Sequence, residues 1–409
     1  MDAGNVTLYA SLFVALYFEV FMLINFLEKR SSLKQEETLM PQRLPTITVI
    51  VPAYNEEKTV VKTVFSLLKL DYPKEKLRII VVDDGSTDKT PEVLRRFRGH
   101  KRVTLLHKQN GGKYTALNSG IAISKSELIG CLDADSFVPP DTLGKIIPYF
   151  NDEKTMAVTP AMKIHRPDRF IRRVQSDEYD LGIFMKKCFS ILHSITVTPG
   201  PFSIFRRQVF DNLGPFRAAH NTEDLEIAMR MQKNFYGIRN AHTAMVYTVG
   251  PGTIRKLYRQ RVRWIYGFLA NMIDYRVLLF NRKYKHLGMF TLPGLVLSII
   301  MFFLSLAIGL WSINKFIWQK ILEFQAVGLH WPAWRFDWIN FTTDAKLLLF
   351  LILFGSTIAL AMAGRRISEK KTSFSFHIIY FPIAYVILSI FWLSRAVLNV
   401  AIAEQAKWR

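Results

Sequence analysis

Four apolar segments, each about as long as a bilayer is thick, constrain this chain of 409 residues more than any other feature. Residues 287–314, 347–364 and 372–394 contain no Asp, Glu, Lys or Arg, and residues 6–27 contain one charged side chain, Glu19. A helix of about 20 apolar residues crosses the hydrocarbon core. We therefore predict transmembrane helices at residues 6–27, 288–312, 346–364 and 374–400.

The distribution of basic residues predicts how these helices are oriented. Lys and Arg cluster after the first segment (29–30), before the second (282–285) and between the third and fourth (365–371). The positive-inside rule assigns such flanks to the cytoplasm. We therefore expect a multi-pass protein of the cell membrane with its N-terminus and its C-terminus outside. Residues 28–286 are then cytoplasmic, and residues 313–345 form an extracytoplasmic loop.

The formal net charge of +21 needs a physical explanation. Such a charge can indicate nucleic-acid binding, but no groove-reading or base-stacking motif accompanies it, so we expect no nucleic-acid partner. A basic domain that rests on anionic membrane lipids and handles a negatively charged ligand explains the charge better. Cys131 and Cys188 both fall in the predicted cytoplasmic part, where reducing conditions argue against a structural disulfide.

Residues 45–250 carry a repeated strand–helix pattern. Short runs rich in β-branched residues alternate with segments of helical periodicity, such as residues 58–70 and 113–123. Strands separated by helices of this length predict an α/β domain built on a mostly parallel sheet. The predicted strands are residues 46–51, 77–82, 103–107 and 129–132.

Polar side chains follow three of these strands at the edge where parallel sheets bind ligands. They are Asn55-Glu56, Asp83-Asp84 and the pair Asp133 and Asp135. The last pair can bind a ribose and a hard divalent cation, although such a spacing also arises by chance. Asp83-Asp84-Gly85 can bind a base or a ribose, or it can be an ordinary Asp-Gly turn before a helix.

Two later segments, residues 170–192 and 254–280, show a basic amphipathic pattern that favours helices in the membrane interface. The second contains Gln260, Arg263 and Trp264 within the sequence Gln-Arg-Val-Arg-Trp. The Arg can bind a diphosphate, the Trp can stack on a sugar ring, and the Gln can orient either group. We therefore predict that these interfacial helices, residues 253–286, contribute to a site for a nucleotide sugar.

Glu223 and Asp224 begin another stretch of helical periodicity. Two acidic residues at a helix N-terminus stabilise the helix dipole, which would be a purely structural role. Alternatively, Asp224 is a general base that takes a proton from an acceptor hydroxyl. This feature taken alone does not decide between the two.

The order of these features along the chain is more specific than any one of them. A single Asp, an Asp-x-Asp, a Glu-Asp and a Gln-x-x-Arg-Trp follow one another. This order resembles glycosyltransferase family 2, in particular its membrane-integrated processive polysaccharide synthases of the cellulose, chitin, hyaluronan and poly-N-acetylglucosamine type. The segments Val-Pro-Ala-Tyr-Asn-Glu (51–56), Gly-Gly-Lys-Tyr-Thr-Ala-Leu-Asn (111–118) and Gly-Pro-Phe-Ser-Ile-Phe-Arg-Arg (200–207) match it too. The resemblance covers about residues 45–280.

The resemblance implies a GT-A fold, which has a Rossmann-like, mostly parallel sheet, and an inverting transfer from a UDP-sugar. Asp84 would contact the uracil, Asp133 the ribose, and Asp135 together with Asp133 would hold Mg²⁺ or Mn²⁺. Asp224 would be the catalytic base, and Trp264 would stack under the acceptor. The donor site would comprise Ala53, Asn55, Glu56, Asp84, Lys113, Asp133, Gln260 and Arg263. The acceptor site would comprise Gly200, Pro201, Glu223 and Trp264.

We therefore expect an enzyme that extends a β-linked polysaccharide at the membrane, with a glycan or lipid acceptor as its second substrate. Transfer of one sugar to a lipid carrier or glycolipid is the alternative, and a non-catalytic scaffold that keeps the fold is a third. Many such synthases have a Glu two residues after a Tyr ahead of Gln-x-x-Arg-Trp, whereas here Tyr247 leads to Val249. Four spans are few for a polymer channel, which leaves a homo-oligomer open.

Overall fold

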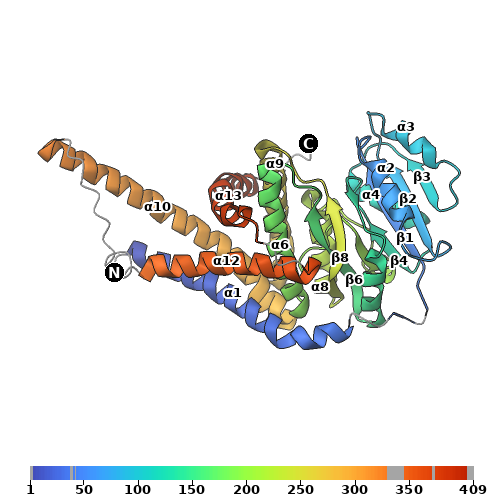
Figure 1. Ribbon diagram of the computed structural model, residues 1–409, viewed down its shortest axis with the longest axis horizontal. Coiled ribbons are helices and arrows are strands. Elements are labelled where there is room, and N and C mark those ends of the chain that lie inside the picture. The colour runs from blue at the N-terminus through green and yellow to red at the C-terminus, as the bar shows by residue number, and fades with distance from the viewer. Residues whose placement is uncertain (1–2, 37–39, 42, 329–344, 371–373, 403–409) are drawn as a thin grey trace.

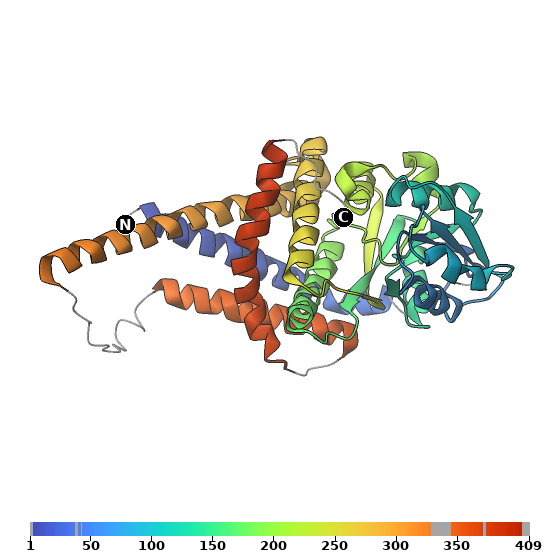
Figure 2. The same ribbon diagram turned by 90° about the horizontal axis from the view of Figure 1, so that it is seen from above.

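The computed structural model describes residues 3–36, 40–41, 43–328, 345–370 and 374–402. An α/β domain lies at one end of the molecule, and long helices extend away from it (Figures 1 and 2). About half of the predicted extracytoplasmic loop 313–345, from residue 329 to 344, falls outside the described residues.

An eight-stranded mixed sheet forms the centre of the α/β domain. Its strands are β1 (Ile47–Ala53), β2 (Leu77–Asp83), β3 (Val103–His107), β4 (Leu128–Cys131), β5 (Ser136–Phe137), β6 (Thr155–Ile164), β7 (Ser203–Arg206) and β8 (Gly237–Thr248). They lie in the order β3-β2-β1-β4-β7-β6-β8-β5. The first four strands in this order pair in parallel, as do β6 and β8, and the other neighbours are antiparallel. The predicted α/β sheet domain is confirmed.

Helices cover both faces of this sheet, which explains why its strands read as continuous apolar runs. Val49 and Val51 of β1 pack in the core beside α2 (Val60–Leu68), whereas Ile50 packs in the opposite core beside α4 (Lys113–Ile123). The other helices of the domain are α3 (Thr90–Leu94), α5 (Thr142–Ile146), α6 (Phe170–Ile191), α7 (Gln208–Leu213) and α8 (Glu223–Lys233).

Four helices are long and apolar enough to cross a membrane. They are α1 (Ala3–Glu36), α10 (Leu292–Val327), α12 (Ala345–Glu369) and α13 (His377–Ala401). Helix α10 ends 15 residues beyond the predicted boundary at residue 312, so the first part of the predicted 313–345 loop is helical. Hydropathy drops at Lys315 and Lys320, but no helix breaker occurs before Gly328, whose φ is +76°.

The orientation of α13 departs from a simple bundle of four spans. Helices α1, α10 and α12 extend away from the sheet domain, whereas α13 runs across them beside α9 (Ile254–Asp274) (Figures 1 and 2). Leu257 and Val262 of α9 pack against Trp392 and Leu393 of α13. Hydropathy depends only on how apolar a segment is, so it could not predict the direction in which α13 runs.

The junction between the α/β domain and the membrane helices is close and charged. At Gly364 of α12, an added Cβ would lie 1.8 Å from the backbone oxygen of Asp180 on α6, so only glycine permits this approach. The next residue, Arg365, bonds through Nε to Asp180 at 2.8 Å and through Nη2 to Asp177 at 2.7 Å. About two turns earlier in α12, the hydroxyl groups of Ser356 and Thr357 donate hydrogen bonds to the carboxylate of Glu19 of α1.

Candidate active site

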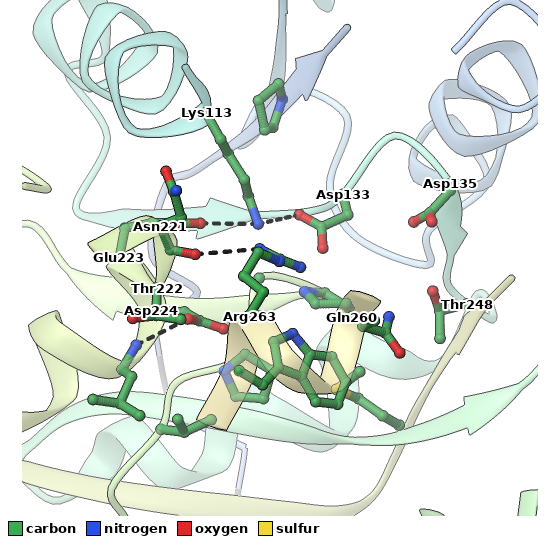
Figure 3. Close-up of a pocket in the computed structure, with 18 of the residues that line it drawn as sticks. Lys113, Asp133, Asp135, Asn221, Thr222, Glu223, Asp224, Thr248, Gln260 and Arg263 are labelled. Carbon is green, nitrogen blue, oxygen red and sulfur yellow. Dashed lines mark hydrogen bonds and ion pairs between the residues drawn. The ribbon is translucent and has the colours of Figure 1, made fainter. Parts of the chain in front are cut away.

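The carboxyl ends of the central strands, the first turn of α4 and the helices α6, α8 and α9 enclose a cavity of about 990 Å³. Residues from distant parts of the chain meet there, as Figure 3 shows. All but one of the predicted site residues line it: Ala53, Glu56, Asp84, Lys113, Asp133, Asp135, Gly200, Pro201, Glu223, Asp224, Gln260, Arg263 and Trp264.

Asn55 is the exception, since it is not among the lining residues. It has a positive φ of 55°, and its side-chain oxygen accepts hydrogen bonds from the backbone N–H groups of Thr87 at 2.8 Å and Asp88 at 3.3 Å. Asn55 therefore joins the loops that follow β1 and β2. Its predicted contact with the nucleotide sugar stays a prediction, because sequence spacing does not tell which residue of the loop faces the cavity.

Asp84 organises the loop that leads to Lys113. Its carboxylate accepts hydrogen bonds from the backbone N–H groups of Gly111 at 3.1 Å and Gly112 at 2.9 Å, and from Lys108 Nζ at 2.6 Å. Gly112 has a φ of +91°, which glycine adopts without strain, and α4 begins at the next residue. The buried Asp84 borders the cavity, but three donors already occupy its carboxylate.

Lys113 lies between the carboxylates of Asp133 and Glu223 (Figure 3). Its Nζ is 2.7 Å from Asp133 Oδ1 and 3.1 Å from Glu223 Oε1. Burial alone would lower the pKa of Lys113, but the charges of Asp133, Glu223 and Asp224 outweigh burial and raise it. Lys113 is therefore a permanently charged bridge between the end of β4 and the start of α8.

Asp135 stands apart from this bridge, two residues beyond Asp133. Burial, together with the negative charges of Asp133 and Glu56, raises the pKa of Asp135 to about 7. Crowded carboxylates of this kind favour a bound cation. Among the described residues, no three His, Cys, Asp or Glu side chains form a complete metal site. Asp133 and Asp135 are the residues that could hold a cation in this cavity.

The step from Glu223 to Asp224 places two carboxylates with different acidities at the start of α8. For Glu223, burial would raise the pKa, but the charge and hydrogen bond of Lys113, a backbone hydrogen bond and the charge of Arg263 together lower the pKa below its usual value. Burial and the charge of Glu223 raise the pKa of Asp224 to about 6. Neighbouring titratable groups whose pKa values are pushed apart in this way are typical of acid–base sites.

Helix α9 carries the Gln-x-x-Arg-Trp segment and places it beside Glu223 and Asp224. Gln260, Arg263 and Trp264 line the cavity from one side of the helix. Arg263 Nη1 donates to the backbone oxygen of Asn221 at 3.2 Å. One turn farther on, a Cβ at Gly267 would lie 2.3 Å from Thr222 Cγ2, so the absence of a side chain there permits close packing of α9 against the start of α8.

Sequence reasoning missed the contribution of α6, which we expected to be only an interfacial helix. Glu178, Tyr179, Gly182 and Lys186 line the cavity from successive turns of this helix. Burial lowers the pKa of Lys186 to about 8, and the charge of Asp224 partly opposes this shift. The spacing of these residues was visible in the sequence, but a polar stripe on an amphipathic helix normally faces solvent.

Comparison with known proteins agrees with this geometry. Residues 48–214 match the glycosyl transferase family 2 domain. The chain therefore carries a family 2 glycosyltransferase domain. The predicted resemblance to membrane polysaccharide synthases of this family is confirmed, and so is the prediction of a glycosyltransferase.

The glycosyltransferase is similar to two curated poly-β-1,6-N-acetyl-D-glucosamine synthases. The synthase of Staphylococcus epidermidis is 27% identical over 379 residues, which cover 91% of this chain and 88% of that protein. The synthase of Staphylococcus aureus strain COL is 29% identical over 272 residues, 65% of this chain and 66% of that protein.

A solved structure shares the fold across almost the whole chain. It is a mannosyltransferase from Pyrobaculum calidifontis in complex with GDP-Man and Mn²⁺, with a TM-score of 0.58. The likeness covers 96% of this chain and 99% of that chain at 18% sequence identity. The predicted GT-A fold with added membrane helices is thus confirmed.

Proposed function

We propose that this glycosyltransferase extends a β-linked polysaccharide at the membrane, taking N-acetylglucosamine from its UDP derivative and adding sugars processively. The observation that carries the proposal is the meeting of Asp135, Asp224 and Trp264 in one cavity. A cation site, a base and an aromatic platform are what transfer from a nucleotide sugar to a glycan requires. The similarity to poly-β-1,6-N-acetyl-D-glucosamine synthases supports the choice of sugar.

The donor half of the cavity is the half that holds Asp133 and Asp135. These carboxylates, with oxygens of the donor diphosphate, would hold Mg²⁺ or Mn²⁺, which neutralises the charge that grows on the leaving UDP. Arg263 lines the same cavity and can bind the diphosphate through its guanidinium group. Lys113 can exchange its contact with Asp133 for one with the nucleotide.

The acceptor half is the half that holds Asp224 and Trp264. Asp224 takes the proton of the acceptor hydroxyl, whose oxygen attacks the anomeric carbon of the donor sugar. The bond from that carbon to the UDP oxygen breaks, the electron pair leaves with UDP, and the configuration inverts. Trp264 stacks under the terminal acceptor sugar and holds it at attack distance, beside Gly200 and Pro201.

The basic residues that flank the spans support a location for the catalytic domain. We place the α/β domain on the cytoplasmic side, where UDP-sugars are made, with the N-terminus of α1 outside the cell membrane. Helices α1, α10 and α12, which extend away from the α/β domain (Figure 2), would then cross the bilayer. Three or four spans per chain leave room for a homo-oligomer to complete a path for the polymer.

The decisive experiment measures UDP release by the purified protein in lipid nanodiscs with a panel of UDP-sugars, with and without EDTA. We expect release with UDP-N-acetylglucosamine only, loss of activity in EDTA, and its recovery on addition of Mg²⁺ or Mn²⁺. Gel sizing should show a ladder of products. A single glycolipid product would support the alternative of one transfer to a lipid, and no release with any donor would refute the proposal.

A separate variant tests the acceptor platform. Replacing Trp264 by Ala removes the stacking surface but leaves the carboxylates of the donor half in place. We expect elongation to fall by about tenfold or more, the value of a lost sugar–aromatic contact of about 1.4 kcal/mol, while hydrolysis of the donor by water changes little. Equal losses in both reactions would argue against acceptor stacking.

A further inference from the structure

A cluster of three side chains lies behind Trp264, formed by helices that are far apart in the sequence. Glu178 of α6 accepts a hydrogen bond from Arg261 Nη2 of α9 at 2.5 Å. Tyr385 of α13 donates its hydroxyl hydrogen to the same oxygen of Glu178, and its own oxygen lies 3.2 Å from Arg261 Nη2. The three groups thus form a closed set in which each contacts the other two.

Arg261 connects this cluster to the acceptor platform. Its guanidinium carbon lies 4.6 Å from the ring centre of Trp264 and 5.6 Å from that of Tyr385. A guanidinium group held over an aromatic face attracts the ring and restricts where it can lie. Arg261 is only 9% exposed, so it has little freedom to leave this position.

Stability alone does not account for the cluster. A buried ion pair often contributes no more to folding than well-packed apolar side chains of the same volume. Glu178 and Arg261 moreover line the same cavity as Trp264 and Asp224. Apolar residues could join α6, α9 and α13, as they do where Leu257 packs beside Trp392, but they could not hold a charged group over the Trp264 ring.

We infer that Glu178 and Tyr385 are positioning residues that, through Arg261, fix the ring of Trp264 on which the acceptor sugar stacks. The C-terminal helix α13 is thereby part of the acceptor site, although Tyr385 does not line the cavity. The inference rests on the proposed role of Trp264 as the acceptor platform.

The donor half of the cavity is separate from this cluster. Within the described part of the chain, no hydrogen bond or ion pair joins Glu178, Arg261 or Tyr385 to Lys113, Asp133 or Asp135. Loss of the Tyr385 hydroxyl should therefore change how the enzyme uses its acceptor and leave its use of the donor unaltered. A role in folding alone would affect both to the same degree.

The test replaces Tyr385 by Phe, which removes one hydroxyl and keeps the ring. Tyr380→Phe is the matched control, because Tyr380 lies on the same helix and is 53% exposed. Initial rates are measured in nanodiscs against a short acceptor oligosaccharide and against the UDP-sugar. For Tyr385→Phe we expect about a tenfold rise in the acceptor KM and shorter products, since a buried hydrogen bond is lost. The donor KM, donor hydrolysis by water and all parameters of Tyr380→Phe should match the wild type.

A second variant keeps the inference testable if Tyr385→Phe is poorly folded. Glu178→Gln preserves the shape of the side chain but removes the charge that holds Arg261, and it should raise the acceptor KM in the same way. Unchanged acceptor KM in both variants, or equal changes in acceptor and donor parameters, would overturn the inference. A wild-type protein that releases no UDP would instead refute the proposed function itself, so the two failures are distinguishable.

Discussion

At the scale of single residues, Glu223 and Asp224 show how adjacent carboxylates acquire different roles. Lys113 bonds to Glu223 at 3.1 Å and helps to keep it ionised. Within the described residues Asp224 forms no ion pair at such a distance, and burial and the charge of Glu223 raise its pKa. A base must accept a proton near the operating pH, and a raised pKa meets that requirement. Both the helix-dipole role and the catalytic role are compatible with this position, so experiments on Asp224 decide between them.

Replacing Asp224 by Asn should abolish sugar transfer. The amide keeps the size of the side chain but cannot take the acceptor proton, so we expect the rate to fall by about 10²–10⁴-fold. Binding of UDP, measured by calorimetry, should remain within a few-fold of the wild type. Substantial turnover by Asp224→Asn would leave the carboxylate with only its structural role at the start of α8.

The acidity of Asp224 also predicts a pH dependence. Its pKa is raised to about 6, so the carboxylate is ionised above this value and protonated below it. Initial rates at saturating donor should therefore fall as the pH drops from 7 to 5. Glu223, Lys113, Arg263, Asp133 and Lys186 are the charged groups that act on Asp224. A rate that stays constant down to pH 5 would contradict the assignment of Asp224 as the base.

At the scale of elements, α6 has a larger part than its sequence pattern indicated. One side of it lines the cavity and another packs against α12, where Gly364 approaches the backbone of Asp180. The same helix therefore connects the catalytic domain to a membrane helix. Local periodicity predicted the helix itself but not its two neighbours, because an amphipathic pattern does not identify what covers each face.

The contact at Gly364 predicts the effect of one added methyl group. In Gly364→Ala the Cβ would collide with backbone, so α6 and α12 must separate, and we expect a loss of about 1–3 kcal/mol in the free energy of unfolding. Gly355→Ala is the control on the same helix, since no atom lies within 4 Å of its added Cβ. Thermal unfolding in one detergent compares them. Equal melting temperatures for the two variants would show that α6 and α12 are not so closely packed.

At the scale of the whole molecule, the direction of α13 bears on how the chain sits in the membrane. It runs across α1, α10 and α12, packs along α9 and contributes Tyr385 to the cluster behind Trp264. Its mean hydropathy of 1.8 is the lowest of the four candidate spans. The length and composition of α13 meet the requirements of a fourth span. Its direction leads us to predict instead that it lies at the membrane surface.

A topology experiment distinguishes the two arrangements. If α13 lies at the surface, an epitope tag added after Arg409 stays on the same side as the α/β domain. In intact cells we expect maleimide labelling of Gln319→Cys, near the far end of α10, but neither labelling of Lys101→Cys in the α/β domain nor antibody access to the tag. The native cysteines Cys131 and Cys188 are buried and give little background. Antibody binding to the tag in intact cells would show that the C-terminus lies outside and would support the four-span topology.

The sequence by itself determined the first four strands, several of the helices and the set of candidate site residues, but it did not predict β5, β6, β7 and β8. Strands such as β1 and helices such as α4 follow from local hydrophobic periodicity, which each segment carries independently of the rest. The ordered motifs predicted the chemistry, because Asp135, Asp224 and Trp264 belong to residue types that transfer from a nucleotide sugar needs.

Only the tertiary structure decided which groups face one another. The bridge from Asp133 through Lys113 to Glu223, the position of Asn55 outside the cavity, and the contact of Tyr385 with Glu178 join or separate residues from different elements. Burial and ion pairing depend on distances in space, and residues 178 and 385 have no relation in local spacing. The energetic environment that sets each pKa and orients each ring therefore arises only when the chain has folded.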